Sequence, residues 1–315
     1  MLVPASLPVV TELGRIPAAR PWLDTLPALI ASVRDEFDLA LEPPLHGGSC
    51  SWVAPARLPD GTPVIVKIGW PHREMLAEPA ALRLWDGRGA VRLLREDPAR
   101  HALVLERCDP GEPLASSSLP APERLRIGCS VLRRLWLAAP DSVGTSFGAS
   151  FGASFGAFED LGTVTAEWAD LTEERLARLR PGYDAGFVGH GVRLLRELPS
   201  SAGSRVLLHG DFNPGNVLSD GGRWLAIDPK PMVGDPAYDP WPLLEQIDDP
   251  FQHPRPVLRD RVRLLAGELD LDAQRIVDWA IARRVETALW AAHHDDVPGG
   301  AHVMSEARAL ADLSR

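Results

Sequence analysis

One stretch, residues 206–228, constrains the fold more than any other part of the chain. It begins with the apolar run Val-Leu-Leu, continues through the polar loop His-Gly-Asp-Phe-Asn-Pro-Gly-Asn at 209–216, and ends with the apolar run Trp-Leu-Ala-Ile before Asp228. A Ser-Asp-Gly-Gly turn interrupts residues 217–227, which therefore predict a β-hairpin. Such a hairpin would hold the end of the polar loop close to Asp228.

The polar residues of this stretch have the spacing of a catalytic loop for phosphoryl transfer. Asp211 is placed to accept a proton from a hydroxyl nucleophile, and Asn216 follows it by five residues. Asp228 stands at the end of an apolar strand, where a carboxylate that binds Mg²⁺ would sit, because this ion prefers carboxylate, amide and phosphate oxygens. The alternative is a surface loop rich in Asp, Asn, Gly and Pro. The His-Gly before Asp211 and the strand before Asp228 favour the catalytic interpretation.

A glycine-rich segment near the N-terminus predicts a phosphate-binding turn between two strands. Residues 46–54 read His-Gly-Gly-Ser-Cys-Ser-Trp-Val-Ala. Gly48 allows close approach of the backbone to a phosphate, and Ser49 and Ser51 can donate hydrogen bonds to it. The segment lacks the G-x-x-x-x-G-K-[ST] pattern of a Walker P-loop. On its own, Gly-Gly-Ser is also compatible with an ordinary turn.

A lysine interrupts the apolar strand Pro-Val-Ile-Val-Lys-Ile at 63–68, which follows the hairpin turn Pro-Asp-Gly. A lysine in a central strand is unfavourable unless it meets an anion, whereas a lysine on an edge strand protects against aggregation. The glycine-rich turn upstream favours a phosphate of ATP as the partner of Lys67. A helix predicted at 74–85 supplies Glu78 as the candidate that pairs with Lys67, with Glu74 as the alternative.

A break after residue 105 predicts a hinge between two lobes. A strand at 101–105 is followed by Glu-Arg-Cys-Asp-Pro-Gly, and the backbone there is free to bind an adenine edge. Residues 1–107 therefore predict an N-terminal lobe of strands with an amphipathic first helix, and residues 108–315 a C-terminal lobe of helices. Helices are expected in five further segments: 125–136, 168–180, 187–198, 262–269 and 276–292.

Composition narrows the classes of function. The formal net charge of −10 and the lack of a basic run argue against nucleic-acid binding and favour a cationic substrate. Three widely spaced cysteines suggest neither a disulfide framework nor a zinc site. The first residues do not resemble a signal peptide, and no apolar run is long enough for a membrane span. We therefore expect a cytoplasmic protein. The tandem Ser-Phe-Gly-Ala repeat at 146–157 predicts a flexible loop.

Taken together, these motifs resemble the aminoglycoside phosphotransferases, over about residues 40 to 300. Residues 227–244 are most similar to the branch of streptomycin 6-phosphotransferases and hydroxyurea phosphotransferases. Their sequence is Ile-Asp-Pro-Lys-Pro-Met-Val-Gly-Asp-Pro-Ala-Tyr-Asp-Pro-Trp-Pro-Leu-Leu. The resemblance implies an α+β, bilobal protein-kinase-like fold with a small, mainly β N-lobe and a larger, mainly α C-lobe.

The resemblance also implies ATP and Mg²⁺ as cofactors and a role for each matching residue. These roles are phosphate binding by Lys67, orientation of Lys67 by Glu78, base catalysis by Asp211, Mg²⁺ binding by Asn216 and Asp228, and an adenine border that includes Glu106 and Cys108. Protein kinases carry an arginine at the position of Gly210 and a D-F-G motif where this chain has Asp-Pro-Lys at 228–230. A protein-kinase activation loop is therefore not implied.

The function that these residues predict is an ATP-dependent kinase of a small hydroxylated molecule, an antibiotic of the streptomycin class. Hydroxyurea or another small metabolite is the alternative acceptor. A nucleotide-binding pseudokinase is a second class, although a pseudokinase would be expected to lack the base or a metal ligand. A metal hydrolase is a third, but it leaves Lys67 without a role.

A cationic acceptor would need carboxylates close to Asp211. The candidates are Asp235, Asp239, Glu245 and Glu286, and Asp235 has the alternative role of bracing the catalytic loop. Hydroxyurea is neutral and would need no such lining. We expect a monomer that acts on a small molecule and binds neither nucleic acid nor membrane.

Overall fold

The computed structural model describes residues 2–139 and 155–314, apart from the side chains of Glu74 and Ser314. The chain forms two compact units. Unit 1 consists of Met1–Gly111 and Ser219–Ile227, and unit 2 consists of Glu112–Leu218 and Asp228–Arg315. The sequence suggested a boundary after residue 107 and gave no sign that the segment around the Gly-Gly turn groups with the first unit.

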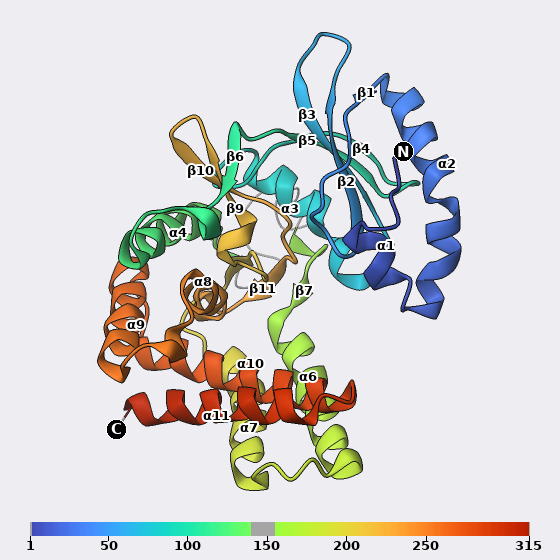
Figure 1. Cartoon of the computed structure of the whole chain (residues 1–315). Helices are drawn as coiled ribbons and strands as arrows, with labels where there is room; N and C mark the ends of the chain where they lie inside the picture. Colours follow the sequence, from blue (N-terminus) through green and yellow to red (C-terminus); the bar gives the residue numbers. More distant parts are fainter. Residues whose placement is uncertain (1, 140–154, 315) are drawn as a thin grey trace. The chain divides into compact units, whose positions relative to one another are not determined.

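The centre of unit 1 is a five-stranded antiparallel sheet (Figure 1). Its strands, in the order in which they pair, are β1 (Ala40–Leu41), β2 (Ser51–Arg57), β3 (Pro63–Gly69), β5 (Ala102–Glu106) and β4 (Leu93–Asp97). The predicted turn between β2 and β3 is confirmed, with Gly61 at a φ of 85° and the amide of Gly61 bonded to the carbonyl of Leu58 at 2.8 Å. The sheet makes β3 an interior strand.

One strand expected in unit 1 is almost absent. The segment before the glycine-rich turn pairs as a strand only at Ala40–Leu41, followed by single backbone bonds from Glu42 to Pro55 and from Leu45 to Val53. Pro43 and Pro44 explain this, because proline has no N–H to donate to a ladder. The prediction of a full strand before the turn is therefore wrong.

Three helices accompany the sheet of unit 1: α1 (Pro8–Leu13), α2 (Arg20–Phe37) and α3 (Glu78–Trp85). The predicted amphipathic helix is α2, and its Leu26, Ile30 and Val33 are buried in one core with side chains of β2 and β3. A 3₁₀ turn at Arg73–Met75 precedes α3, so this helix begins four residues later than expected. Pro79 lies in its first turn, where a backbone N–H would have no acceptor within the helix, so the lack of an N–H in proline removes no hydrogen bond.

A hairpin from later in the sequence completes unit 1. Strands β9 (Val217–Asp220) and β10 (Arg223–Ala226) confirm the predicted hairpin, of which the part Ser219–Ile227 belongs to unit 1. A further short strand, β6, spans Pro110–Pro113. Within unit 1, Val91 donates to the carbonyl of Ala226 at 3.0 Å, and the amide of Ala226 donates to Gly89 at 2.7 Å. These bonds anchor the hairpin to residues far away in the sequence.

Unit 2 is mainly helical. Its helices are α4 (Ala121–Leu135), α6 (Leu161–Leu179), α7 (Ala185–Ser200), α8 (Pro240–Ile247), α9 (Arg255–Leu269), α10 (Ala273–His293) and α11 (Val297–Ala311). Helix α10 is the central one, with buried residues on several faces, and α11 runs alongside it (Figure 1). The expected helices are confirmed. Helix α11 was not predicted, because glycine, proline and histidine interrupt its apolar periodicity.

A small sheet in unit 2 holds the polar loop at 209–216. Strand β11 (Met232–Gly234) pairs antiparallel with β8 (Val206–Leu208) and parallel with β7 (Glu159–Asp160). The apolar run before the loop is therefore a buried strand, as predicted. The loop leaves β8, and the segment that begins at Asp228 returns to β11, so both are attached to one sheet.

The Ser-Phe-Gly-Ala repeat lies mostly outside the described residues. Of its last unit, residues 155–157 are described, and there Phe155 is buried with its ring centroid 6.1 Å from that of Phe158. The prediction of a loop without packing is wrong for this residue. None of the helices in the described part of the chain is long and apolar enough to cross a membrane.

Candidate active site

The loop around Asp211 is held in a single conformation by its own backbone. Gly210 has a φ of 82°, and a Cβ placed on it would lie 1.9 Å from the carbonyl oxygen of Lys230. His209 is buried, its Nδ1 accepts the amide of Asp211 at 3.3 Å, and its carbonyl accepts the amide of Lys230 at 2.8 Å. Only glycine fits at position 210, since it combines a left-handed φ with close backbone contact.

The carboxylate of Asp211 is oriented through both of its oxygens. Asn213 donates its side-chain amide to Oδ1 at 3.3 Å, and the ammonium of Lys230 lies 3.4 Å from Oδ2. Asn216 donates to the carbonyl of Asp211 at 3.0 Å. The side chain of Asp211 remains 29% exposed. A fixed and accessible carboxylate can accept a proton from a hydroxyl group.

Asp239 supports this loop by hydrogen bonds to its backbone. Its Oδ2 accepts the amide of His209 at 2.9 Å and the indole N–H of Trp136 at 3.0 Å, and its Oδ1 accepts the amide of Gly210 at 2.9 Å. The side chain is buried, and burial raises the pKa of Asp239, while His209 and the N–H donors act in the opposite direction. Bracing of the loop was the alternative role considered for Asp235, and in the structure it is Asp239 that accepts the loop amides.

Asp235 is equally buried and ties the 3₁₀ turn Pro236–Tyr238 to helix α10. Its Oδ2 accepts the guanidinium of Arg275 and the indole of Trp279, both at 2.6 Å. Its Oδ1 accepts the amide of Ala237 at 3.0 Å and so begins the 3₁₀ turn Pro236–Tyr238. Fully engaged, buried carboxylates do not line an accessible surface, so neither Asp235 nor Asp239 is placed as the sequence suggested for acceptor binding.

The other two candidate acceptor carboxylates form ion pairs inside unit 2. Glu245 pairs with Arg284 at 2.6 Å, and Glu286 pairs with Arg175 at 2.9 Å. Burial raises the pKa of Glu286, although Arg175 opposes this. Both carboxylates keep some exposure, so their use by a cationic acceptor stays a prediction.

The two candidate metal ligands are accessible. Asn216 is half-buried, and because its Nδ2 donates to Asp211, its carbonyl oxygen is the atom that can bind a cation. Asp228 is exposed and has a φ of 55°, a left-handed conformation uncommon for residues other than glycine. Among residues 2–139 and 155–314, no three His, Cys, Asp or Glu side chains are grouped closely enough to hold a metal.

Unit 1 contains the predicted lysine–glutamate pair. The ammonium of Lys67 lies 2.7 and 2.6 Å from the two carboxylate oxygens of Glu78. Only 8% of the Lys67 side chain and 2% of the Glu78 side chain are exposed. Lys67 therefore lies in an interior strand opposite a buried anion, and the alternative of an edge lysine is wrong.

The remaining predicted nucleotide-binding residues also lie in unit 1. Gly48 has a φ of 86°, as the predicted turn requires, with Ser49 in the turn and Ser51 buried at the start of β2. Glu106 accepts the amide of Arg92 at 3.0 Å. Cys108 is buried, and burial raises the pKa of its thiol to about 12. Its side chain is therefore a neutral, apolar surface at neutral pH.

Several residues that shape the site were not singled out from the sequence. They are Asn213, Lys230, Trp136, Arg275 and Trp279. A lysine two positions after Asp228 was visible in the sequence, but nothing indicated that it would turn back to Asp211. The tryptophans and Arg275 come from helices or helix ends distant in sequence, which no local pattern could connect to the loop.

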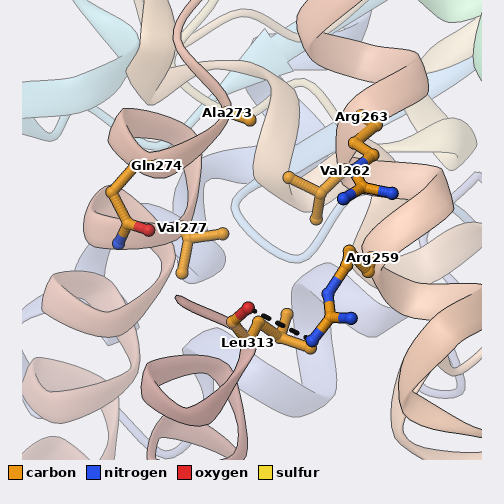
Figure 2. A pocket seen from close by; sticks show the side chains of 7 residues that line it. All are labelled: Arg259, Val262, Arg263, Ala273, Gln274, Val277 and Leu313. Atoms are coloured by element: carbon orange, nitrogen blue, oxygen red, sulfur yellow. Dashed lines mark hydrogen bonds between the residues drawn. The ribbon is translucent and has the colours of Figure 1, made fainter. Parts of the chain in front are cut away.

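The clearest hollows in the described part of unit 2 contain none of the predicted site residues. One, of about 310 Å³, lies among α9, the start of α10 and the C-terminal turn. Figure 2 shows Arg259 directed at Leu313, whose carbonyl it contacts at 3.4 Å, with Arg263 nearby on the same helix. Another, of about 530 Å³, includes Asp184 and Arg308.

The fold is that of the protein-kinase-like phosphotransferases. Similar solved structures include choline kinase from Streptococcus pneumoniae, with a TM-score of 0.60, 15% identity and coverage of 90% of this chain and 99% of that one. An aminoglycoside phosphotransferase in a ternary complex with ADP and hygromycin B has a TM-score of 0.59 and 16% identity, over 90% and 97% of the two chains. At these identities the likeness establishes the fold alone, and it confirms the predicted fold class.

The family is established by the sequence. Residues 41–295 match the family described as aminoglycoside/hydroxyurea antibiotic resistance kinase, and the chain belongs to this family. It is 35% identical to streptomycin 6-kinase of Streptomyces griseus, over 86% of this chain and 84% of that protein. It is 33% identical to hydroxyurea phosphotransferase of Kitasatospora aureofaciens, over 89% and 77%. The predicted kinase activity is confirmed, and ATP is the phosphate donor that it implies.

Proposed function

We propose that this kinase transfers the γ-phosphoryl group of ATP to a hydroxyl of a streptomycin-type aminoglycoside and so inactivates the antibiotic. One observation carries the proposal. A chain 32% and 35% identical to two streptomycin 6-kinases carries Asp211 in a His-Gly-Asp loop, with a carboxylate that is hydrogen-bonded and still accessible. Hydroxyurea is the second candidate, because a hydroxyurea phosphotransferase is similar to the same degree.

The chemistry assigned to Asp211 is general-base catalysis. It accepts the proton of the acceptor hydroxyl as that oxygen attacks the γ-phosphorus. Asn213 orients the carboxylate, and Asp239 keeps the loop backbone in place through His209 and Gly210. Because phosphoryl transfer depends mainly on positioning and electrostatics, a rigid loop is a direct contribution to the rate.

Asn216 and Asp228 are proposed to hold Mg²⁺. Their donor set fits this ion, since one amide oxygen and one carboxylate supply hard oxygen ligands and the phosphates of ATP supply others. When bound, Mg²⁺ would neutralise charge on the phosphates.

Unit 1 is proposed to bind the nucleotide. Lys67, oriented by Glu78, would contact the α- and β-phosphates, and the turn at Gly48 with Ser49 and Ser51 would lie against them. Glu106 and Cys108 would border the adenine. The neutral thiol of Cys108 suits an apolar base, since its raised pKa of about 12 prevents a charge there.

Glu245 and Glu286 remain the proposed contacts for a cationic acceptor. Both keep partly exposed carboxylates, whereas Asp235 and Asp239 are buried. A guanidinium group of the acceptor would compete with Arg284 or Arg175 for them. Such an attraction between exposed charges weakens as salt screens it, over about 8–10 Å at ordinary ionic strength.

The experiment is a steady-state assay of ADP release with streptomycin, hydroxyurea and neutral sugars, with mass spectrometry of the acceptor product. We expect phosphorylated streptomycin and a KM for streptomycin that rises with salt at fixed ATP and Mg²⁺. Turnover restricted to hydroxyurea, or a KM independent of salt, would overturn the cationic-acceptor assignment. Release of inorganic phosphate without a phosphorylated acceptor would indicate a hydrolase.

A further inference from the structure

Lysine is used at only two positions in this chain. Of its 33 Lys and Arg residues, all except Lys67 and Lys230 are arginines. Arginine offers a broad, planar fork of donors, whereas lysine is a compact ammonium with three rotatable N–H groups that binds phosphate as a point charge. Lys67 already has a proposed phosphate role, and the second lysine stands beside the catalytic base.

The backbone of Lys230 is part of the catalytic loop's support. Its amide donates to the carbonyl of His209 at 2.8 Å, and its own carbonyl oxygen lies where a Cβ of residue 210 would be. The main chain of Lys230 and that of the loop can therefore move only together. The backbone contact therefore fixes the position of the Lys230 Cα, from which the side chain extends, relative to Asp211.

The side chain of Lys230 is partly exposed and lies beside the catalytic carboxylate. Its ammonium lies 3.4 Å from Oδ2 of Asp211, and 44% of the side chain is exposed. An ammonium hydrogen bond to a carboxylate is normally 2.7–2.9 Å long. A longer, solvated pair contributes little to stability. The arrangement keeps a partly exposed cation beside the base.

We propose that Lys230 binds the γ-phosphoryl group of ATP and stabilises the charge that develops on it during transfer. The inference rests on the proposed function of Asp211. In the step, the acceptor oxygen forms a bond to the γ-phosphorus and gives its proton to Asp211. The bond from phosphorus to the bridging oxygen breaks, and ADP leaves with that electron pair. Lys230 keeps its proton throughout and donates hydrogen bonds to the γ-phosphoryl oxygens.

A local cation is needed because the loop at 209–216 contains neither lysine nor arginine. Electrostatic stabilisation works when donors are positioned before the reaction at the place where charge develops. Lys230 meets that condition through its fixed backbone. Its contact with Asp211 also connects the base and the phosphoryl group through one side chain, which places both near the attacking hydroxyl.

The test uses the unmodified protein and the fact that it has two lysines. Reductive methylation, followed by peptide mass spectrometry, reports the reactivity of each amine separately. It is carried out without nucleotide, with Mg·ADP, and with Mg and a nonhydrolysable ATP analogue whose β,γ-bridge is a methylene. We expect Lys230 to react in the first two states and to be protected by the analogue. Lys67 is buried and should react slowly in all three, which makes it the internal control.

Two results of the labelling would overturn the proposal. Equal protection of Lys230 by ADP and by the analogue would place it on the α- or β-phosphate, and no protection by either would remove it from the nucleotide. A Lys230→Met variant gives a second measurement, by calorimetric binding of the same nucleotides. We expect affinity for the analogue to fall about tenfold, the usual value of one charge-assisted hydrogen bond, while affinity for ADP stays the same. An equal loss for both would indicate a purely structural role, and Lys230→Arg, which keeps the charge, should lose less.

The outcome is distinguishable from failure of the proposed function. If the wild-type protein binds both nucleotides but phosphorylates neither streptomycin nor hydroxyurea, the acceptor assignment fails and the labelling still decides the role of Lys230. If Lys230 is not protected while streptomycin is phosphorylated, the inference fails and the proposed function stands.

Discussion

The two lysine–carboxylate pairs of this protein differ in almost every physical respect. In unit 1, Lys67 and Glu78 form two bonds of 2.7 and 2.6 Å, and less than a tenth of either side chain is exposed. In unit 2, Lys230 and Asp211 are 3.4 Å apart, with 44% and 29% of their side chains exposed. We call Lys67–Glu78 the closed pair because it is buried, and Lys230–Asp211 the open pair because it is partly exposed to solvent.

This difference in burial suits the two pairs to different tasks. A buried pair holds a side chain in position, whereas an exposed pair can change its contacts during a reaction. A buried pair is expensive to break, because the remaining charge has no solvent to receive it. Lys67 is therefore fixed in place by Glu78. An exposed pair exchanges partners at little cost. In the proposed mechanism, Asp211 would exchange its contact with Lys230 for the acceptor hydroxyl, and Lys230 would exchange its contact with Asp211 for a phosphate oxygen.

Replacement of the open carboxylate should have the largest effect, and on activity alone. Asp211→Asn keeps the shape and the contact with Asn213 but cannot accept the proton. We expect kcat to fall by about 10²–10⁴, the usual value of a positioned acid or base. ATP affinity and melting temperature should be unchanged, which calorimetry and thermal unfolding would check. Near-normal turnover would remove Asp211 from the proposed mechanism.

Breaking the closed pair should have the next largest effect, and on stability. Glu78→Gln leaves the ammonium of Lys67 buried without its anion, and we expect the free energy of unfolding to fall by about 3–5 kcal/mol. The matched control is the double variant Lys67→Met with Glu78→Leu, which removes both charges and should recover most of this loss. Denaturant unfolding measures all of these values. A loss below about 1 kcal/mol for Glu78→Gln would mean that the pair is effectively solvated.

Breaking the open pair from the lysine side should have the smallest effect on stability. Lys230→Met removes a half-exposed ammonium, and exposed ion pairs contribute less than about 1 kcal/mol. The variant should therefore unfold at nearly the denaturant concentration of the wild type. A loss similar to that of Glu78→Gln would show that the two pairs are equivalent in energy, and the comparison would fail.

The sequence was informative wherever a short pattern carries its own physics. Alternating strands, turn residues and the 3.6-residue helical period identified β3, β8, the β9–β10 hairpin and α2. Lys67 was identified because a cation on an apolar strand requires an anion. The polar loop was singled out because Asp211, Asn216 and Asp228 have a spacing that could bring a base and two metal ligands close together.

The sequence was least informative about carboxylates, because an aspartate at the surface and one in the core have the same letter. Asp235 and Asp239 were predicted to face an acceptor, and both are instead satisfied by donors from Trp279, Arg275 and Trp136. Those donors are 40 or more residues away. Burial and hydrogen bonding across such separations are properties of the tertiary fold, and no local pattern records them.

The hairpin of unit 1 has a consequence for how the chain is made. Ser219–Ile227 is synthesised after the whole of Glu112–Leu218, yet its partners Gly89 and Val91 leave the ribosome long before it. Domains usually fold from the N-terminus during synthesis. Unit 1 cannot do so completely, because the backbone groups of Gly89 and Val91 wait for Ala226. A chain that ended at residue 111 would therefore lack the isolated bridge between Ala90 and Ala226, and during synthesis Gly89 and Val91 must wait for this bridge until the first half of unit 2 has been made.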